Sequence, residues 1–138
     1  MRFLPLSWAC LAVALGTVAC GGSAAGSGDH AVAGTFVGNW SCTLALTQTA
    51  FTVAVVENSD GSITVTPTGA AVPLCTAKYT VSDGTATVES GQSCTTGGST
   101  VAVSGGTATV SGSTLTGNLT VGVAGVSETL SYTCTKQP

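Results

Sequence analysis

Few residues in this chain could do chemistry, and most of those are cysteines. The 138-residue sequence has six cysteines and one histidine. Cys42, Cys75, Cys94 and Cys134 show no CxxC spacing, and the histidine, His30, precedes all four. Zinc sites usually draw on closely spaced thiolate and imidazole ligands, so we expect no metal site. Four cysteines in an exported chain instead predict two disulfide bonds.

Catalytic chemistry is not predicted. Serine and threonine are plentiful, but no histidine follows His30 to activate a hydroxyl nucleophile. The pairs Gly97-Gly98 and Gly105-Gly106 are not followed by a helical pattern, so they do not form a phosphate loop. We therefore expect neither an enzyme nor a cofactor. Three basic residues stand against six acidic ones, a balance that predicts no nucleic-acid binding.

The beginning of the chain has the layout of an export signal. Arg2 precedes an apolar stretch that is too short to span a bilayer, and small residues follow. Val18-Ala19-Cys20 resembles the lipobox of bacterial lipoproteins, whose cysteine receives the lipid. The resemblance implies a signal peptide over residues 1–19 and acyl chains such as palmitate on Cys20. It also implies anchoring to the cell envelope, and Gly21 after the cysteine favours the outer membrane.

Thr17 leaves an alternative open, because lipoboxes usually have Leu at that position. An ordinary signal peptidase could cleave after Ala25, and the product would be periplasmic or secreted. Residues 20–34 are mostly Gly, Ala and Ser, a composition that predicts a flexible tether. The remainder, residues 35–138, is long enough for one domain.

From Phe36 onward, apolar residues alternate with polar ones, which predicts strands with one buried face. Turn signals such as Asn58-Ser59-Asp60-Gly61 separate the runs. We find no helical period after the signal. We expect an all-β fold, an antiparallel up-and-down meander of about eight or nine short strands in a closed or nearly closed barrel. A two-sheet β-sandwich is the alternative.

The Asp83-Gly84 turn defines one hairpin register. It places Tyr79 opposite Val88 on the apolar face and Lys78 opposite Glu89 on the polar face. Cys75 and Cys94 lie just beyond the open end of this hairpin. They miss the strict register by two residues, which a bulge or a splayed end could absorb. We therefore predict a Cys75–Cys94 bond.

The remaining pair, Cys42 and Cys134, lies on the first and last strands, and both cysteines have apolar-face parity. These strands are neighbours when a meander closes into a barrel. We therefore predict a Cys42–Cys134 bond at the closure, with Trp40 buried near that seam.

The segment Gly38-Asn39-Trp40 resembles the Gly-x-Trp motif of lipocalins, which starts their first strand and closes the base of the barrel. The arginine that packs on this tryptophan in that family has no counterpart in the exported part of the chain. By parity, Trp40, Tyr79, Glu128 and Tyr132 are candidates for lining a cavity. The sequence thus favours a membrane-tethered binding module for a small apolar molecule. The alternative is a structural or adhesive surface protein with a filled core and a Thr-rich exterior, and a protein partner stays open.

Overall fold

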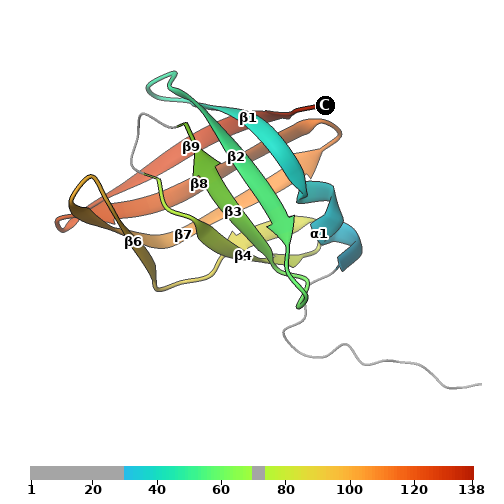
Figure 1. The fold of residues 1–138 in the computed structure, drawn as a ribbon, viewed down its shortest axis with the longest axis horizontal. Coiled ribbons are helices and arrows are strands. Elements are labelled where there is room, and N and C mark those ends of the chain that lie inside the picture. Colours follow the sequence, from blue (N-terminus) through green and yellow to red (C-terminus); the bar gives the residue numbers. More distant parts are fainter. Residues whose placement is uncertain (1–29, 70–73) are drawn as a thin grey trace, which may run out of the picture.

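The computed structural model describes residues 30–69 and 74–138, and this part of the chain forms a β-barrel with a short helix at one end (Figure 1). The helix is α1 (His30–Phe36). The strands are β1 (Gly38–Leu44), β2 (Ala50–Glu57), β3 (Ile63–Thr68), β4 (Ala77–Ser82), β5 (Thr85–Val88), β6 (Gln92–Thr96), β7 (Ser99–Ser111), β8 (Thr114–Val123) and β9 (Val126–Lys136).

The barrel is closed. The sheet runs in the order β5-β4-β3-β2-β1-β9-β8-β7-β6, and β5 also pairs with β7. Eight strands therefore make a complete antiparallel ring in meander order, and β6 is an additional strand beside β7. The predicted all-β meander is confirmed, and the two-sheet sandwich is not the fold. Closure removes the exposed sheet edges that would otherwise pair with other chains.

Strands β5 and β6 are two pieces of one interrupted strand along β7. Thr87 pairs with Thr107, and Gln92 pairs with Val103, so the registers of the two pieces differ by only one residue. The break at residues 89–91 turns the chain at Gly91, whose φ of 80° suits glycine. Cys75 and Cys94 miss the strict register of the Asp83-Gly84 hairpin by two residues, and this break absorbs the difference.

The Gln92 side chain replaces the backbone pairing that is lost at this break. Its Oε1 accepts a hydrogen bond from the Lys78 backbone N–H at 2.7 Å. Its Nε2 donates to the carbonyl oxygens of Lys78 and Glu89 at 2.8 and 2.7 Å. A carboxamide has the same donor and acceptor as a peptide group, so it can continue the ladder beside β4.

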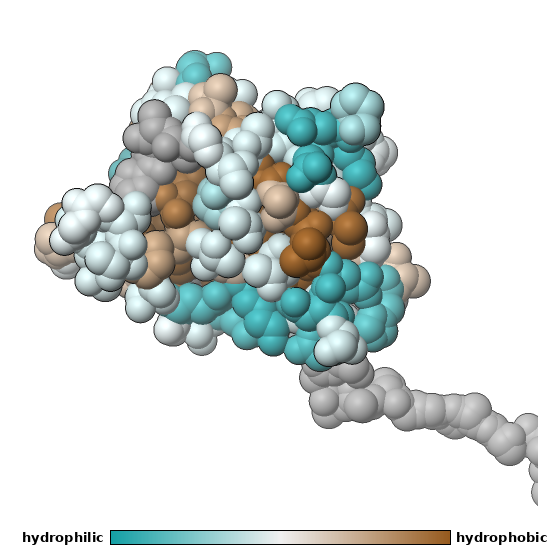
Figure 2. Space-filling view, in the orientation of Figure 1, coloured by the Kyte–Doolittle hydropathy of each residue, from teal (hydrophilic) through white to brown (hydrophobic). Residues whose placement is uncertain are grey.

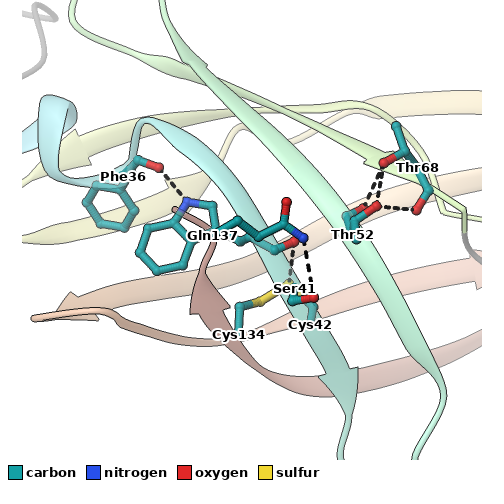
Figure 3. Close-up of a disulfide and its surroundings, with 8 residues drawn as sticks. Phe36, Ser41, Cys42, Thr52, Thr68, Cys134 and Gln137 are labelled. Carbon is teal, nitrogen blue, oxygen red and sulfur yellow. Dashed lines mark hydrogen bonds between the residues drawn. A yellow bond between two sulfur atoms is a disulfide. The ribbon is translucent and has the colours of Figure 1, made fainter.

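Both predicted disulfides are present. Cys75 is bonded to Cys94 across the break, with a Cα–Cα distance of 5.7 Å. Cys42 is bonded to Cys134, and these two residues are directly opposed in the β1–β9 pair with Cα atoms 3.9 Å apart (Figure 3). Trp40 is fully buried two residues before Cys42, as predicted. The Asp83-Gly84 hairpin also has the predicted register, and the Lys78 ammonium lies 3.3 Å from the Glu89 carboxylate.

The domain begins earlier than predicted. Residues 30–34, which we assigned to the tether, belong to α1, and its residues Ala33 and Phe36 are buried in the core. The helix has seven residues. That length is under two full turns of about 3.6 residues each, too few to show a helical period among Gly and Ala. The rest of the tether, the signal segment and Cys20 lie outside the described residues.

The outer surface is mostly weakly polar. Figure 2 shows pale residues over much of one face, with teal residues along its lower edge and brown apolar residues between them. The outward-facing residues of β8 and β9 are all Ser, Thr, Asn or Gly, and they bond across the sheet in places, as Thr120 does with Thr129 at 3.0 Å. Within the part of the chain that the structure describes, no helix has the length and apolar character to cross a membrane.

Candidate functional site

The end of the barrel next to α1 is closed by aromatic side chains. Phe36, the last residue of α1, is 1% exposed and points into the barrel. The indole N–H of Trp40 donates a hydrogen bond of 2.8 Å to the Phe36 carbonyl oxygen. This bond satisfies a carbonyl that the helix end would otherwise leave unpaired. Trp40 therefore holds the helix in place across the base.

A lysine completes the base from outside. The Lys136 ammonium lies 5.3 Å from the centre of the Trp40 ring, within the range of a cation–π contact. Gly38 has a φ of 129°, and a Cβ there would lie 3.2 Å from the Lys136 side chain. Glycine thus leaves room for the lysine to reach the ring. We did not foresee from the sequence that Lys136 places a cation on this ring.

Above this base the barrel encloses an apolar cavity of about 50 Å³. Its walls come from β1, β2, β3, β4, β7, β8 and β9, so residues far apart in the sequence meet around it. Representative lining residues are Phe51, Val55, Ile63, Leu115 and Leu119. All the described residues that line it are apolar, apart from two tyrosines. Such a cavity favours uncharged, apolar contents, because a charge inside it would lose its hydration without gaining a partner.

One side of the cavity lies where β3 and β4 separate. These strands pair only from Ile63–Tyr79 to Val65–Ala77. Pro67 follows on β3, where it still pairs with β2 but no longer with β4. Proline has no backbone N–H to donate to a second neighbour, which suits this position. Pro67 and Leu74 both line the cavity here, so the wall at this side is made of side chains rather than of paired backbone.

The two tyrosines are the polar part of the cavity. Tyr79 on β4 is 3% exposed, Tyr132 on β9 is partly buried, and both line the cavity. Burial raises the pKa of Tyr79 far above its usual range, and the charge that Tyr132 would carry as a phenolate raises it further. Burial also raises the pKa of Tyr132, and the hydrogen bond with Tyr79 partly offsets this. Both phenols are therefore neutral at physiological pH.

The position of Tyr132 is fixed by its neighbours. Its ring meets Phe51 edge to face, with ring centres 6.4 Å apart. It lies opposite Gly117 on β8, where a Cβ would come within 2.6 Å of the tyrosine oxygen. The Tyr132 ring occupies the space that a side chain at position 117 would take, a common way to cover a glycine in a sheet.

Of the four candidate cavity residues, the structure places two in the cavity wall. Tyr79 and Tyr132 line it. Trp40 does not, because its ring is buried in the base against α1. Glu128 does not either: it is exposed near the start of β9, beyond the last residue that pairs with β1, so water solvates its carboxylate. Strand parity predicted which face of the sheet these side chains occupy but not their position along the barrel axis.

The strongest charge cluster lies on the outer surface, away from the cavity. The Lys78 ammonium is 3.0 Å from Asp60 and 3.3 Å from Glu89. Hydrogen bonds from the Ser62 hydroxyl, from Lys78 and from the Ser62 backbone N–H hold the pKa of Asp60 well below its usual range. These groups are exposed, and such pairs add little to stability. The cluster fixes the turn after β2 but faces no cavity.

Two contacts made by α1 were not foreseen from the sequence. Phe36 lies in a helix that we assigned to the tether, and the pair of His30 with Glu57, which joins α1 to β2, was not foreseen. The stretch before Phe36 shows no apolar period, so the sequence holds no local signal that this helix packs on Trp40. Within residues 30–69 and 74–138, no group of His, Cys, Asp and Glu side chains is arranged to hold a metal ion.

Comparison of the chain with protein-family models, with curated proteins and with solved structures finds no match in any of the three.

Proposed function

We propose that this protein is an exported binding module whose barrel holds a small apolar molecule. The observation that carries this proposal is the apolar cavity, closed at one end by Phe36 and lined by residues from seven strands. Ligand sites are typically apolar hollows with a few polar groups that orient the ligand. The tyrosine pair is such a polar group.

The cavity limits the size of the ligand. Its volume is about 50 Å³, whereas pockets for drug-sized molecules are roughly 300–1,000 Å³. An apolar cavity of about 150 Å³ can hold benzene. The proposed ligand is therefore a small molecule of a few heavy atoms, or one that inserts only a narrow apolar end.

Binding can be tested with a pair of matched variants. Ala108 lines the cavity from β7, whereas Ala102 on the same strand faces outward and is exposed. Ala108→Val adds two methyl groups to the cavity, and Ala102→Val adds the same groups outside. Titration with 2-butanone should shift the methyl resonances of Val55 and Leu119 in the wild type and in Ala102→Val. The shifts should be lost in Ala108→Val. Absence of shifts in the wild type would reject the proposal.

The native ligand needs a separate experiment. Native mass spectrometry of the protein purified from its own host should show the polypeptide, any attached lipid and any retained small molecule together. A mass that is fully explained by the polypeptide and lipid, in several preparations, would count against a tightly held ligand.

We propose that the module is anchored through lipid on Cys20. The lipobox resemblance of Val18-Ala19-Cys20 supports this, and so do the two disulfides, which indicate a non-reducing compartment. Cys20→Ser should move the protein from the membrane fraction to the soluble fraction, because each buried CH₂ of an acyl chain contributes about 0.8 kcal/mol to membrane binding. Unchanged partitioning would favour cleavage by an ordinary signal peptidase.

A structural or adhesive role is the second candidate. It is supported by the outer face of β8 and β9, where the outward side chains are uncharged and rich in hydroxyls. Cross-strand contacts such as Thr109–Thr116 at 3.4 Å continue this pattern onto β7. Substitution of several outward threonines by lysine would disturb adhesion without affecting the cavity. The two candidates therefore respond to different variants.

A further inference from the structure

We infer that Tyr79 and Tyr132 together form a hydrogen-bond donor that selects a neutral ligand with an acceptor oxygen, such as a ketone, an ether or an alcohol. This inference rests on the proposed binding function and adds the chemical class of the ligand. It starts from the composition of the wall, where the two phenol oxygens are the polar side-chain atoms among the described lining residues.

Hydrogen-bond counting leaves one proton free. Each phenol has one O–H donor and an oxygen that accepts. Both phenols line the cavity, and at most one of their two hydroxyls can donate to the other. The hydroxyl that accepts keeps its own proton, and that proton needs an acceptor. The described lining residues offer no other side-chain acceptor, and the strand backbones bond to one another except where β3 and β4 separate, so a ligand oxygen is a suitable acceptor.

Packing orients the side chains of Tyr79 and Tyr132 before a ligand binds. The Tyr132 ring is fixed between Phe51 and Gly117, and Tyr79 is buried in the wall. A donor that is already oriented and dehydrated loses little entropy when it binds its acceptor. The same packing gives the site a fixed direction, with the polar end of the ligand at the tyrosines and its apolar part against the aliphatic wall.

The uncharged wall of the cavity disfavours anionic ligands. The described residues of the wall include no lysine, arginine or histidine, and the base cation, Lys136, lies on the Trp40 ring and is exposed to solvent. A carboxylate inside the cavity would lose its hydration with only a neutral phenol as partner, which is unfavourable. The site therefore discriminates against fatty acids and other organic anions.

Three probes with five heavy atoms each test this selectivity. 2-Butanone has a neutral acceptor, 2-methyl-1-butene has a CH₂ group in place of that oxygen, and propanoate carries a charge. Binding is measured at pH 7 by titration of the Val55 and Leu119 methyl resonances. The variants are Tyr79→Phe, Tyr132→Phe and the double variant, in which phenylalanine keeps the ring. The alkene reports on the shape of the cavity in every variant, so it is the internal control.

The double variant should bind 2-butanone about 2- to 12-fold more weakly, the range that one net hydrogen bond supplies. The Kd of 2-methyl-1-butene should not rise, and propanoate should not bind. The single variants then show which hydroxyl holds the free proton. If the alkene binds but the double variant leaves the ketone Kd unchanged, or if propanoate binds as well as the ketone, this inference is wrong and the proposed function stands. If no probe shifts the cavity methyls of the wild type, the proposed function fails and this inference fails with it.

Discussion

Removal of the two disulfides separately should destabilise the barrel by different amounts. We compare the double variant Cys42→Ala/Cys134→Ala with Cys75→Ala/Cys94→Ala. The β1–β9 pairing already holds Cys42 and Cys134 together, and Cys75 lies just before β4 within bonding distance of Cys94 on β6, so we expect the main effect of each bond in the unfolded chain. A bond that closes a longer loop removes more conformations from that chain.

The structure gives the loop lengths. Cys42 and Cys134 are 92 residues apart, and the chain-entropy relation converts this into about 4.6 kcal/mol at 25 °C. Cys75 and Cys94 are 19 residues apart, which corresponds to about 3.2 kcal/mol. The first variant should therefore be less stable than the second by about 1.4 kcal/mol. Loss of both bonds costs about 8 kcal/mol, a large part of the roughly 5–15 kcal/mol that keeps a typical domain folded.

Urea denaturation without reductant measures both differences. Far-UV circular dichroism follows the loss of β-structure, and the slope of unfolding free energy against urea gives a second test. Because a cross-link keeps the unfolded chain compact, this slope should rise more in the Cys42/Cys134 variant. Equal losses, or a larger loss in the Cys75/Cys94 variant, would refute the entropic reasoning. Packing of the sulfur atoms in the folded barrel would then be the dominant effect.

Three further predictions concern single positions. Gln92→Glu should destabilise by about 1–3 kcal/mol in urea denaturation, because a carboxylate cannot donate to the Lys78 carbonyl; equal stability would mean that the amide does not replace the ladder. The free energy of unfolding should fall above about pH 10, by up to roughly 1.4 kcal/mol per pH unit for each buried tyrosine. Burial keeps the pKa of Tyr79 and Tyr132 raised in the folded protein, so the phenols of the unfolded chain ionise first. Absorbance at 295 nm should rise only as the chain unfolds, and early ionisation of the folded protein would contradict this. Trp40→Phe should speed hydrogen exchange in α1, because the helix loses its bond to the indole; unchanged exchange would mean that other contacts hold the helix.

The closed meander could be foreseen because its evidence is local. The alternation of Trp40, Cys42 and Leu44 with polar residues gives the buried face of β1 whatever its partner strands are. The Asp83-Gly84 turn fixes the register of β4 on β5, because a two-residue turn allows one pairing. The disulfides then followed by combining parity with the expectation of closure. The strand and turn inferences use residues a few positions apart, whereas the Cys42–Cys134 bond followed only once closure of the meander was assumed.

The cavity could be predicted only in part. Parity placed Tyr79 and Tyr132 on inner faces, and they do line the cavity. The same argument included Trp40 and Glu128, which lie at the base and near the opposite end. Parity has a period of two and carries no information on position along the barrel axis. That position depends on the stagger between strands, which long-range pairing sets.

The sequence by itself determined the strands, the turns, the buried cysteines and the low charge of this protein, since these depend on residue type and near neighbours. Only the tertiary structure decided what fills the barrel. It brings α1, which ends at Phe36, against β2 and β4, sets the Tyr132 ring over Gly117, and puts Tyr79 and Tyr132 in the wall of one cavity. Tyr132 and Gly117 meet within the β8–β9 hairpin, whereas Tyr79 and Tyr132 lie on distant strands and share the cavity only because the ring of strands closes. Whether small residues leave a cavity or are covered by a ring depends on packing in three dimensions, and no local pattern encodes it.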